Sequence, residues 1–182
     1  MSQNENEAQI QQNFYCIWVK TGFEEAFIKE IQPLIDLPES SLKGVLHFLK
    51  KQMRLKTGKM YYASLFPGYV FLETSEADIT KFAVFKKGKG FIRFLPQNTE
   101  IEALSPNDLE IVRTILKYGT TIPIVHASFD ENDRIVILDG PFKELPGKVV
   151  AVNRRNKRVN LEVELVNGIR LVGLTYEEVQ KI

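Results

Sequence analysis

The periodicity of the apolar residues changes at Tyr118, and this change limits the possible folds more than any other feature of the chain. Before Tyr118, short strand-like runs alternate with helical patterns. Residues 119–129 have no helical period, and only short strand-like runs follow them. The sequence therefore predicts two domains, residues 14–118 and 130–182, with residues 119–129 as a linker and residues 1–13 as a frayed tail.

The strands of the first domain are predicted from β-branched and aromatic runs at residues 14–22, 45–65 and 90–95, with Thr57-Gly58-Lys59 as a hairpin turn inside the second run. A fourth run, SLFPGYVFLET at residues 64–74, places six apolar or aromatic residues around a Pro-Gly break, with no charge before Glu73. This run is either a core strand that begins directly after a turn or a surface that keeps part of its side chains for a partner.

Three helices are expected between these strands. The first has apolar residues at helical spacing: Phe23, Phe27, Ile31 and Leu34. Ser75 followed by Asp78 resembles a capping box and predicts a short helix to about Phe85. Ser105 before Pro106 is a stronger start, because serine caps the free amides and proline fits the first turn. The order of elements predicts an α+β sandwich with helices on an antiparallel sheet.

The second domain is predicted to be a small β-barrel. Its strand-like runs lie at residues 134–138, 148–152, 157–165 and 169–172, and VNLEVEL within the third alternates strictly between apolar and polar side chains. Asn167-Gly168 is expected to form the hairpin turn, because both residue types tolerate positive φ.

The location of the chain is expected to be cytoplasmic. Cys16 is the single cysteine and cannot form an internal disulfide, and the polar first dozen residues do not resemble a signal peptide. No run of about 18 apolar residues is present, so no contact with a membrane is expected.

Charge is balanced over the whole chain, with 24 basic and 23 acidic side chains, but the basic residues are clustered. Residues 43–59 hold six basic residues and no acid, and NRRNKR at residues 153–158 holds four. Each cluster is either a solvated turn or a phosphate-binding site. The candidate nucleic-acid-binding residues are Lys50, Lys51, Arg54, Lys56, Arg154, Arg155, Lys157 and Arg158.

Residues that could carry enzyme chemistry do not form a recognisable pattern. His47 and His126 lie in different domains, and Cys16 has no spaced partner for a metal site or a nucleophile. GPFKELPGKV lacks the glycine and the hydroxyl that a phosphate loop requires. The sequence therefore predicts a binding protein without catalytic residues, metal or cofactor.

Four stretches together resemble the NusG family of transcription elongation factors: FYCIWVKTGFEEAFIKEI, SLFPGYVFLET, KGKGFIRFL and DRIVILDGPFKELPGKVVAVNRRNKRVNLEVEL. The first domain resembles the family's NGN domain, and the second resembles its SH3-like KOW β-barrel. LFPGYVF, the basic hairpin and NRRNKRV are closer to specialised paralogues of the LoaP and RfaH kind.

The resemblance implies a monomeric processivity and antitermination factor that suppresses pausing. Its NGN domain would bind the clamp helices of the bacterial RNA polymerase largest subunit through Trp18, Phe66, Pro67, Tyr69, Phe71, Phe91 and Phe94. Val70 and Leu72 would then fill the core, because alternate residues of a strand face opposite ways. Lys81 aligns with the family's polymerase gate contact.

Partners of the basic clusters would be nascent RNA and non-template DNA. Two alternatives stay open. One is a general NusG whose barrel contacts Rho or a ribosomal protein, and the other is a KOW-containing RNA-binding or ribosome-associated protein with no polymerase role.

Overall fold

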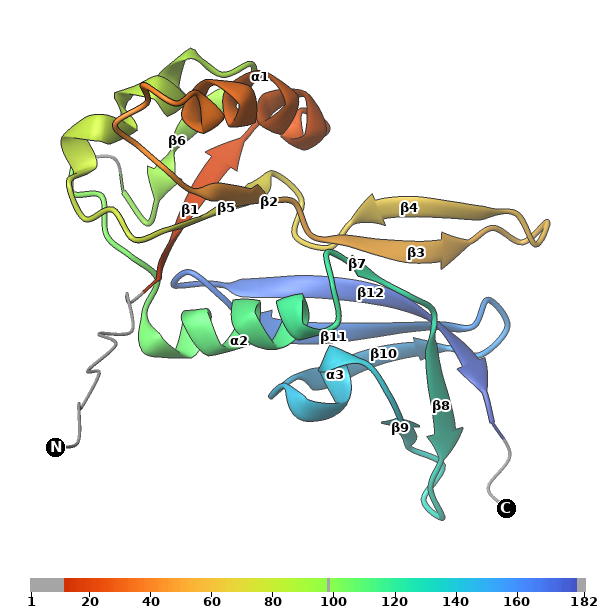
Figure 1. Ribbon diagram of the computed structural model, residues 1–182. Coiled ribbons are helices and arrows are strands. Elements are labelled where there is room, and N and C mark those ends of the chain that lie inside the picture. Colours follow the sequence, from red (N-terminus) through yellow and green to blue (C-terminus); the bar gives the residue numbers. More distant parts are fainter. Residues whose placement is uncertain (1–11, 98, 180–182) are drawn as a thin grey trace, which may run out of the picture.

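A computed structural model describes residues 12–97 and 99–179, so most of the predicted tail lies outside the described residues. The first domain is built on a four-stranded sheet in the order β2-β5-β1-β6 (Figure 1). Its central strands β1 (Asn13–Val19) and β5 (Tyr69–Thr74) pair antiparallel, and β2 (Val45–His47) and β6 (Phe91–Leu95) flank them.

Helix α1 (Glu24–Asp36) and the 3-10 helix η1 (Ile79–Lys87) cover one face of this sheet, as Figure 1 shows for α1. Asp78 caps the start of the 3-10 helix, because its carboxylate accepts from the amide of Thr80. Helix α2 (Pro106–Lys117) belongs to the other face and begins as predicted, with Ser105 Oγ accepting from Asp108 N.

The predicted hairpin around residues 57–59 is present, but the run at residues 45–65 forms three strands instead of two. β3 (Lys50–Arg54) and β4 (Met60–Ser64) make the hairpin, while β2 pairs with β5 in the main sheet. A two-residue strand, β7 (Thr121–Ile122), pairs with β3. The hairpin therefore belongs to a separate three-stranded sheet that lies alongside β12 in Figure 1.

The second domain is a curled five-stranded sheet in the order β10-β11-β12-β8-β9, with a short helix α3 (Pro141–Glu144). The strands are β8 (Val125–Phe129), β9 (Ile135–Ile137), β10 (Lys148–Asn153), β11 (Arg158–Glu164) and β12 (Ile169–Glu178). The sheet curls because β12 pairs with β11 along its first part and with β8 at its end. The predicted α+β fold with a small β domain is confirmed, with the β domain as a half-barrel.

Residues 119–129, expected as a linker, carry β7 and the whole of β8. Ile122, Val125 and Ala127 in this segment are buried. These apolar residues follow no helical period. They are instead the inward-facing residues of the two short strands β7 and β8. The segment is therefore packed against both sheets.

The turn between β11 and β12 lies one residue earlier than expected. Val166 and Asn167 have φ values of 50° and 55°, and Leu165 N donates to Gly168 O at 2.8 Å. A β-branched residue is rarely found at positive φ. The position of Val166 is fixed by a contact outside the turn, since its amide donates to Asp108 Oδ1 at 2.9 Å.

Two apolar clusters fill the molecule, one on each face of the main sheet. Tyr15, Ile17 and Val19 of β1 belong to the cluster beneath α1 and η1, whereas Phe14 and Cys16 belong to the other. The second cluster continues from the sheet through α2 into the second domain, where it includes Val159, Leu161, Val172 and Leu174. The two domains therefore share one apolar core.

Candidate functional site

The candidate partner-binding surface is the face of the main sheet that looks towards the second domain. Phe66, Tyr69 and Phe71 lie together on it, with ring centroids 6.4 Å apart for Phe66 and Phe71 and 6.3 Å apart for Tyr69 and Phe71. Both pairs are edge-to-face, the favoured arrangement of aromatic rings. We call these three residues the aromatic face.

The turn before β5 sets the direction of the aromatic face. Gly68 has a φ of +83°, and a Cβ there would lie 2.8 Å from Val19 O, so only glycine fits this close approach. The buried carboxylate of Glu24 accepts from the amides of Gly22 and Gly68, each at 2.7 Å. The Pro-Gly break in SLFPGYVFLET therefore ties the start of β5 to the start of α1.

The alternation expected along β5 is present. Val70 and Leu72 lie in the cluster under α1, and Tyr69 and Phe71 lie in the opposite cluster. The aromatic face is nevertheless buried, with Phe66 2%, Tyr69 7% and Phe71 0% exposed. The strand is central, as the first interpretation expects, and its second face is covered by the second domain. A partner on that face stays a prediction.

The structure does not bring all seven predicted polymerase-binding residues to one surface. Phe94 lies under α1, stacked on Phe82 with ring centroids 5.7 Å apart, and Phe91 packs beside it at 5.8 Å. Trp18 is half-buried beneath Arg93, and Pro67 is exposed. The sequence alone does not determine which face of the sheet Phe91 and Phe94 occupy. Their face depends on the register of β6 against β1, which pairs Phe94 with Ile17.

The second domain covers the aromatic face with the hairpin of β11 and β12. The Arg170 guanidinium lies over the Tyr69 ring, 5.1 Å from its centroid. Burial raises the pKa of Tyr69 to about 12, although the Arg170 charge acts in the opposite direction. On the α2 side, the bond from Val166 N to Asp108 Oδ1 joins the hairpin to the start of the helix.

A second set of interdomain contacts joins β3 to β11 and β12. Arg158 Nη2 donates to Arg54 O at 2.6 Å, and Arg158 Nη1 lies 3.1 Å from the sulfur of Met53. Arg54 forms an ion pair with Glu177, and its amide donates to Thr175 Oγ1 at 3.4 Å. The basic hairpin is thus part of the domain interface.

Lys51 is buried in this interface. It shares a face of β3 with Met53, which contacts Arg158 and Thr175 of the second domain, and its side chain is 9% exposed. Burial, and secondarily the Arg158 charge, lower the pKa of Lys51 from 10.5 to about 8. The interface therefore favours the neutral form of this lysine.

The contact between the domains should strengthen as the pH rises from about 8 to about 10.5. Over that window Lys51 is neutral in the closed arrangement and charged when exposed, so the open state binds more protons. Below pH 8 Lys51 is charged in both the closed and the open arrangement, so closing the domains carries the full cost of burying that charge. We expect the ratio of closed to open protein to grow up to about tenfold per pH unit, the limit for one proton.

This pH dependence can be measured as protection of residues 119–124 from limited proteolysis between pH 7 and 10. Lys51→Met keeps the apolar stem and removes the titrating group, so it should abolish the slope and protect the segment at pH 7. The pKa of Tyr69 is raised from 10.0 to about 12 in the closed arrangement, so its ionisation favours the open state only above about pH 10. An unchanged slope in Lys51→Met would contradict the role of the lysine.

The eight predicted nucleic-acid-binding residues separate into two groups. Lys50 pairs with Glu25 of α1 at 2.9 Å, Lys51 is buried, and Arg154 pairs with Asp133 while its guanidinium lies 3.8 Å from the Phe129 ring centroid. The other five line a single cleft between the domains: Arg54, Lys56, Arg155, Lys157 and Arg158.

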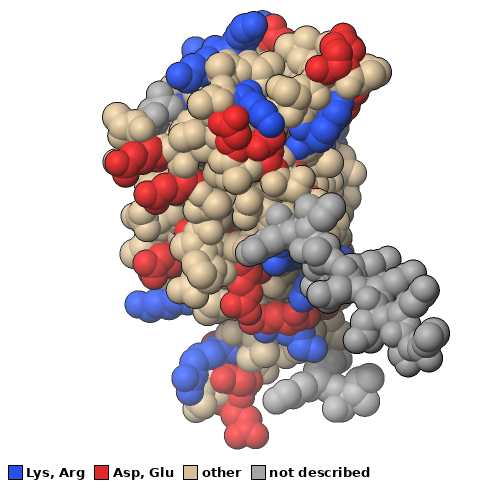
Figure 2. Space-filling model, turned by 60° about the vertical axis from the view of Figure 1, so that its left-hand side comes forward, with Lys and Arg blue, Asp and Glu red and all other residues tan. Residues whose placement is uncertain are grey.

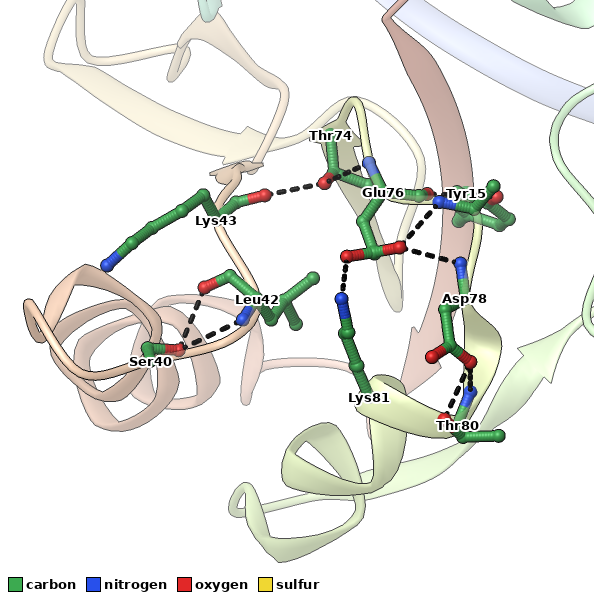
Figure 3. A network of polar contacts seen from close by, with 10 residues as sticks. Tyr15, Ser40, Leu42, Lys43, Thr74, Glu76, Asp78, Thr80 and Lys81 are labelled. Atoms are coloured by element: carbon green, nitrogen blue, oxygen red, sulfur yellow. Dashed lines mark hydrogen bonds and ion pairs between the residues drawn. The ribbon is translucent and has the colours of Figure 1, made fainter.

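Lys81 is held by a local polar network that is drawn in Figure 3. Its ammonium pairs with the Glu76 carboxylate, which also accepts from the amides of Ala77 and Asp78 at 3.1 and 2.8 Å. The ion pair raises the pKa of Lys81 and lowers that of Glu76. Thr74 Oγ1 donates to Lys43 O at 2.5 Å and joins this network to the segment before β2.

Charged side chains of both signs are interspersed on the face of the molecule seen in Figure 2. Within the part of the chain that the structure describes, no three His, Cys, Asp or Glu side chains are grouped as metal ligands would be. Across the same residues, no helix has the length and apolar character needed to cross a bilayer.

Sequence reasoning missed Asp108, Val166 and Arg170 as interface residues. Asp108 follows the predicted helix start at Ser105 by three residues, and Arg170 lies within the predicted strand at residues 169–172. Nothing in the local pattern indicates that either side chain meets the other domain, because that depends on how the domains pack.

Comparisons with known proteins agree on one family. The model of the family described as "Transcription termination factor nusG" matches residues 12–113. The chain is similar to the transcription termination/antitermination protein NusG of Borreliella burgdorferi, with 21% identity over 93% of this chain and 98% of the relative. For the Bacillus subtilis protein of the same name, the identity is 21% over 95% of this chain and 100% of the relative.

Among solved structures, one described as "Domain interaction in Thermotoga maritima NusG" is similar to this fold with a TM-score of 0.61 and 16% sequence identity. The similarity covers 91% of this chain and 94% of that chain, so it extends over both domains.

Proposed function

This chain belongs to the NusG family, and we propose that it is a processivity and antitermination factor that binds the clamp helices of the RNA polymerase largest subunit. The observation that carries the proposal is the aromatic face, where three rings gather on one side of a central sheet. Aromatic side chains are suited to anchor a partner because they bury a large area with few rotamers to freeze.

Binding through this face requires the second domain to move away. Phe66, Tyr69 and Phe71 are covered in the structure, and the Arg170 guanidinium lies over Tyr69. The similar Thermotoga maritima structure is described as a domain interaction in that NusG, which supports an arrangement with the domains in contact. We propose that the closed protein is a resting state and that polymerase binds the open one.

The activity is non-enzymatic. In the open state the first domain would hold the clamp through Phe66, Tyr69 and Phe71, with Trp18 and Pro67 at the margin. The polymerase would stay closed on its template and pass pauses and terminators. The basic hairpin of the first domain and the NRRNKR turn of the second favour a specialised factor of the LoaP and RfaH kind. Its second domain would recruit RNA or a protein partner.

A general NusG is the second candidate, favoured by the shared name of the curated relatives. Its second domain would contact Rho or a ribosomal protein. Terminator readthrough measured in reporters from many operons would separate the two candidates. A specialised factor should raise readthrough on few transcripts, and a general NusG should act on most of them.

Tyr69→Ala should weaken polymerase binding in a protein whose domains are already apart. Val166→Asp, which places a carboxylate beside Asp108 in the interface, provides that background. We expect a loss of about 2 kcal/mol, the size of a hot-spot side chain, which is roughly a 30-fold rise in Kd for core polymerase. Tyr62→Ala is the matched control, because Tyr62 is an exposed aromatic residue outside the aromatic face.

The measurement is a titration of core polymerase, followed by single-round transcription across several terminators. Loss of both binding and readthrough in Tyr69→Ala but not in Tyr62→Ala supports the assignment. Equal binding by the two folded variants would remove the aromatic face as the polymerase site.

A further inference from the structure

The two basic clusters of the sequence, about 100 residues apart, meet in one cleft of about 500 Å³. Arg54, Leu55 and Lys56 line it from the end of β3, and Thr175 lines it from β12. The remaining lining residues are Arg155, Asn156, Lys157 and Arg158, from the turn between β10 and β11. Each domain thus supplies one wall.

The wall from the second domain is a turn of defined shape. Asn153 Oδ1 accepts from Asn156 N at 3.0 Å, and Lys157 has a φ of 51°. The contact from Arg158 Nη2 to Arg54 O then joins this turn to β3 across the interface. The cations of the two walls therefore keep a fixed separation only while the domains are in contact.

Most of the positive charge in the cleft is not neutralised by carboxylates. The five cations face two acids at the rim, since Arg54 pairs with Glu177 and Lys157 pairs with Glu178. Within the described part of the chain, three positive charges remain unbalanced. Among the described residues, Lys56 and Arg155 have no carboxylate within ion-pair distance, and Arg158 is bound to a backbone carbonyl and a sulfur.

We propose that this interdomain cleft binds the phosphodiester backbone of a single-stranded nucleic acid, with Lys56 on one wall and Arg155 on the other as the free phosphate contacts. Phosphate binding by lysine and arginine needs no particular sequence. Exposed Leu55 and the Asn156 amide add an apolar surface and a hydrogen-bonding group for a base. A cleft between two turns suits a single strand, which can bend into it.

The identity of the strand rests on the proposed function: at a transcribing polymerase the single strands are the nascent RNA and the displaced DNA strand. Because the cleft is complete only in the closed arrangement, a bound strand stabilises that arrangement. By linkage, the strand and a partner of the aromatic face then oppose each other's binding. The bound strand would hold the factor in its resting state until the polymerase surface competes.

The test uses the full chain without polymerase, and fluorescence anisotropy with labelled 12-nucleotide oligouridine and oligothymidine. Lys56→Ala with Arg155→Ala should raise Kd at least about tenfold and reduce the log-log salt slope by about 1.4, given roughly 0.7 for each single-strand phosphate contact. Lys59→Ala with Lys148→Ala removes the same charge, one residue from each domain, outside the cleft. This control pair should change Kd less than about twofold, the small effect expected of charges that contact no phosphate.

The composite nature of the site is tested with Val166→Asp, which changes no residue of the cleft. It should weaken oligouridine binding about as much as the cleft double variant, and Val166→Asn should not. Tighter binding of oligouridine than of oligothymidine assigns the site to RNA, and the reverse assigns it to the displaced DNA strand.

Two results would overturn the proposal: equal effects of the cleft and control pairs, or full affinity in a Val166→Asp protein whose domains are shown to be apart. Neither depends on polymerase. A failed cleft and a failed polymerase site are therefore distinguished by separate titrations.

Discussion

Val166→Asp should separate the two domains, and Val166→Asn should leave them in contact. Both substitutions suit the turn, because Asp and Asn tolerate the positive φ that Val166 adopts at 50°. They differ in charge. The aspartate carboxylate would replace a side chain that is 6% exposed in the shared core, beside the Asp108 carboxylate that accepts from the amide of residue 166.

An uncompensated buried charge costs about 3 to 5 kcal/mol, which would lower the ratio of closed to open protein by at least about 100-fold. Small-angle scattering should then show a larger radius of gyration for Val166→Asp, and proteases should cut within residues 119–124. Each domain should keep its circular dichroism. An unchanged radius for a folded Val166→Asp protein would show that the Asp108 contact does not hold the domains together.

The elements of the fold could be predicted where a local pattern determines them. The Ser105 cap of α2, the hairpin at residues 57–59 and the alternation along β5 all follow from residues close in sequence. The turn of β11 and β12 lies one residue earlier than the sequence predicts, because Val166 is not a usual residue at positive φ. Its conformation accompanies a bond to Asp108 on another domain, which no local pattern contains.

The candidate site was only partly predictable for the same reason. The aromatic and basic residues were found by type, but their grouping depends on the register of β6 and on the packing of the domains. The registers of β5 and β6 against β1 place Tyr69 and Phe94 on opposite faces of the main sheet. Packing moved Lys51 and Arg158 into the interface and brought Arg54, Lys56 and Arg155 to one cleft.

Phe94→Ala should destabilise the first domain, which distinguishes this residue from the aromatic face. Phe94 is 0% exposed and packs against Phe82, Phe85 and Phe91, with ring centroids 5.7 to 5.9 Å away. Replacing a buried phenylalanine with alanine leaves a cavity and costs about 3 to 5 kcal/mol. That loss is a large part of the stability of a domain, which is commonly about 5 to 15 kcal/mol.

Denaturant unfolding, followed by circular dichroism, measures this loss as a lower midpoint for Phe94→Ala. Ile92→Ala is the control from the same strand, because Ile92 is 44% exposed and its truncation should change the free energy of unfolding by less than about 1 kcal/mol. Phe94→Leu should recover most of the loss, since it refills the cavity with apolar volume. Any loss of polymerase binding in Phe94→Ala should then track the unfolded fraction and disappear in Phe94→Leu. A stable Phe94→Ala protein that no longer binds polymerase would instead return Phe94 to the partner surface, and the register of β6 would be in error.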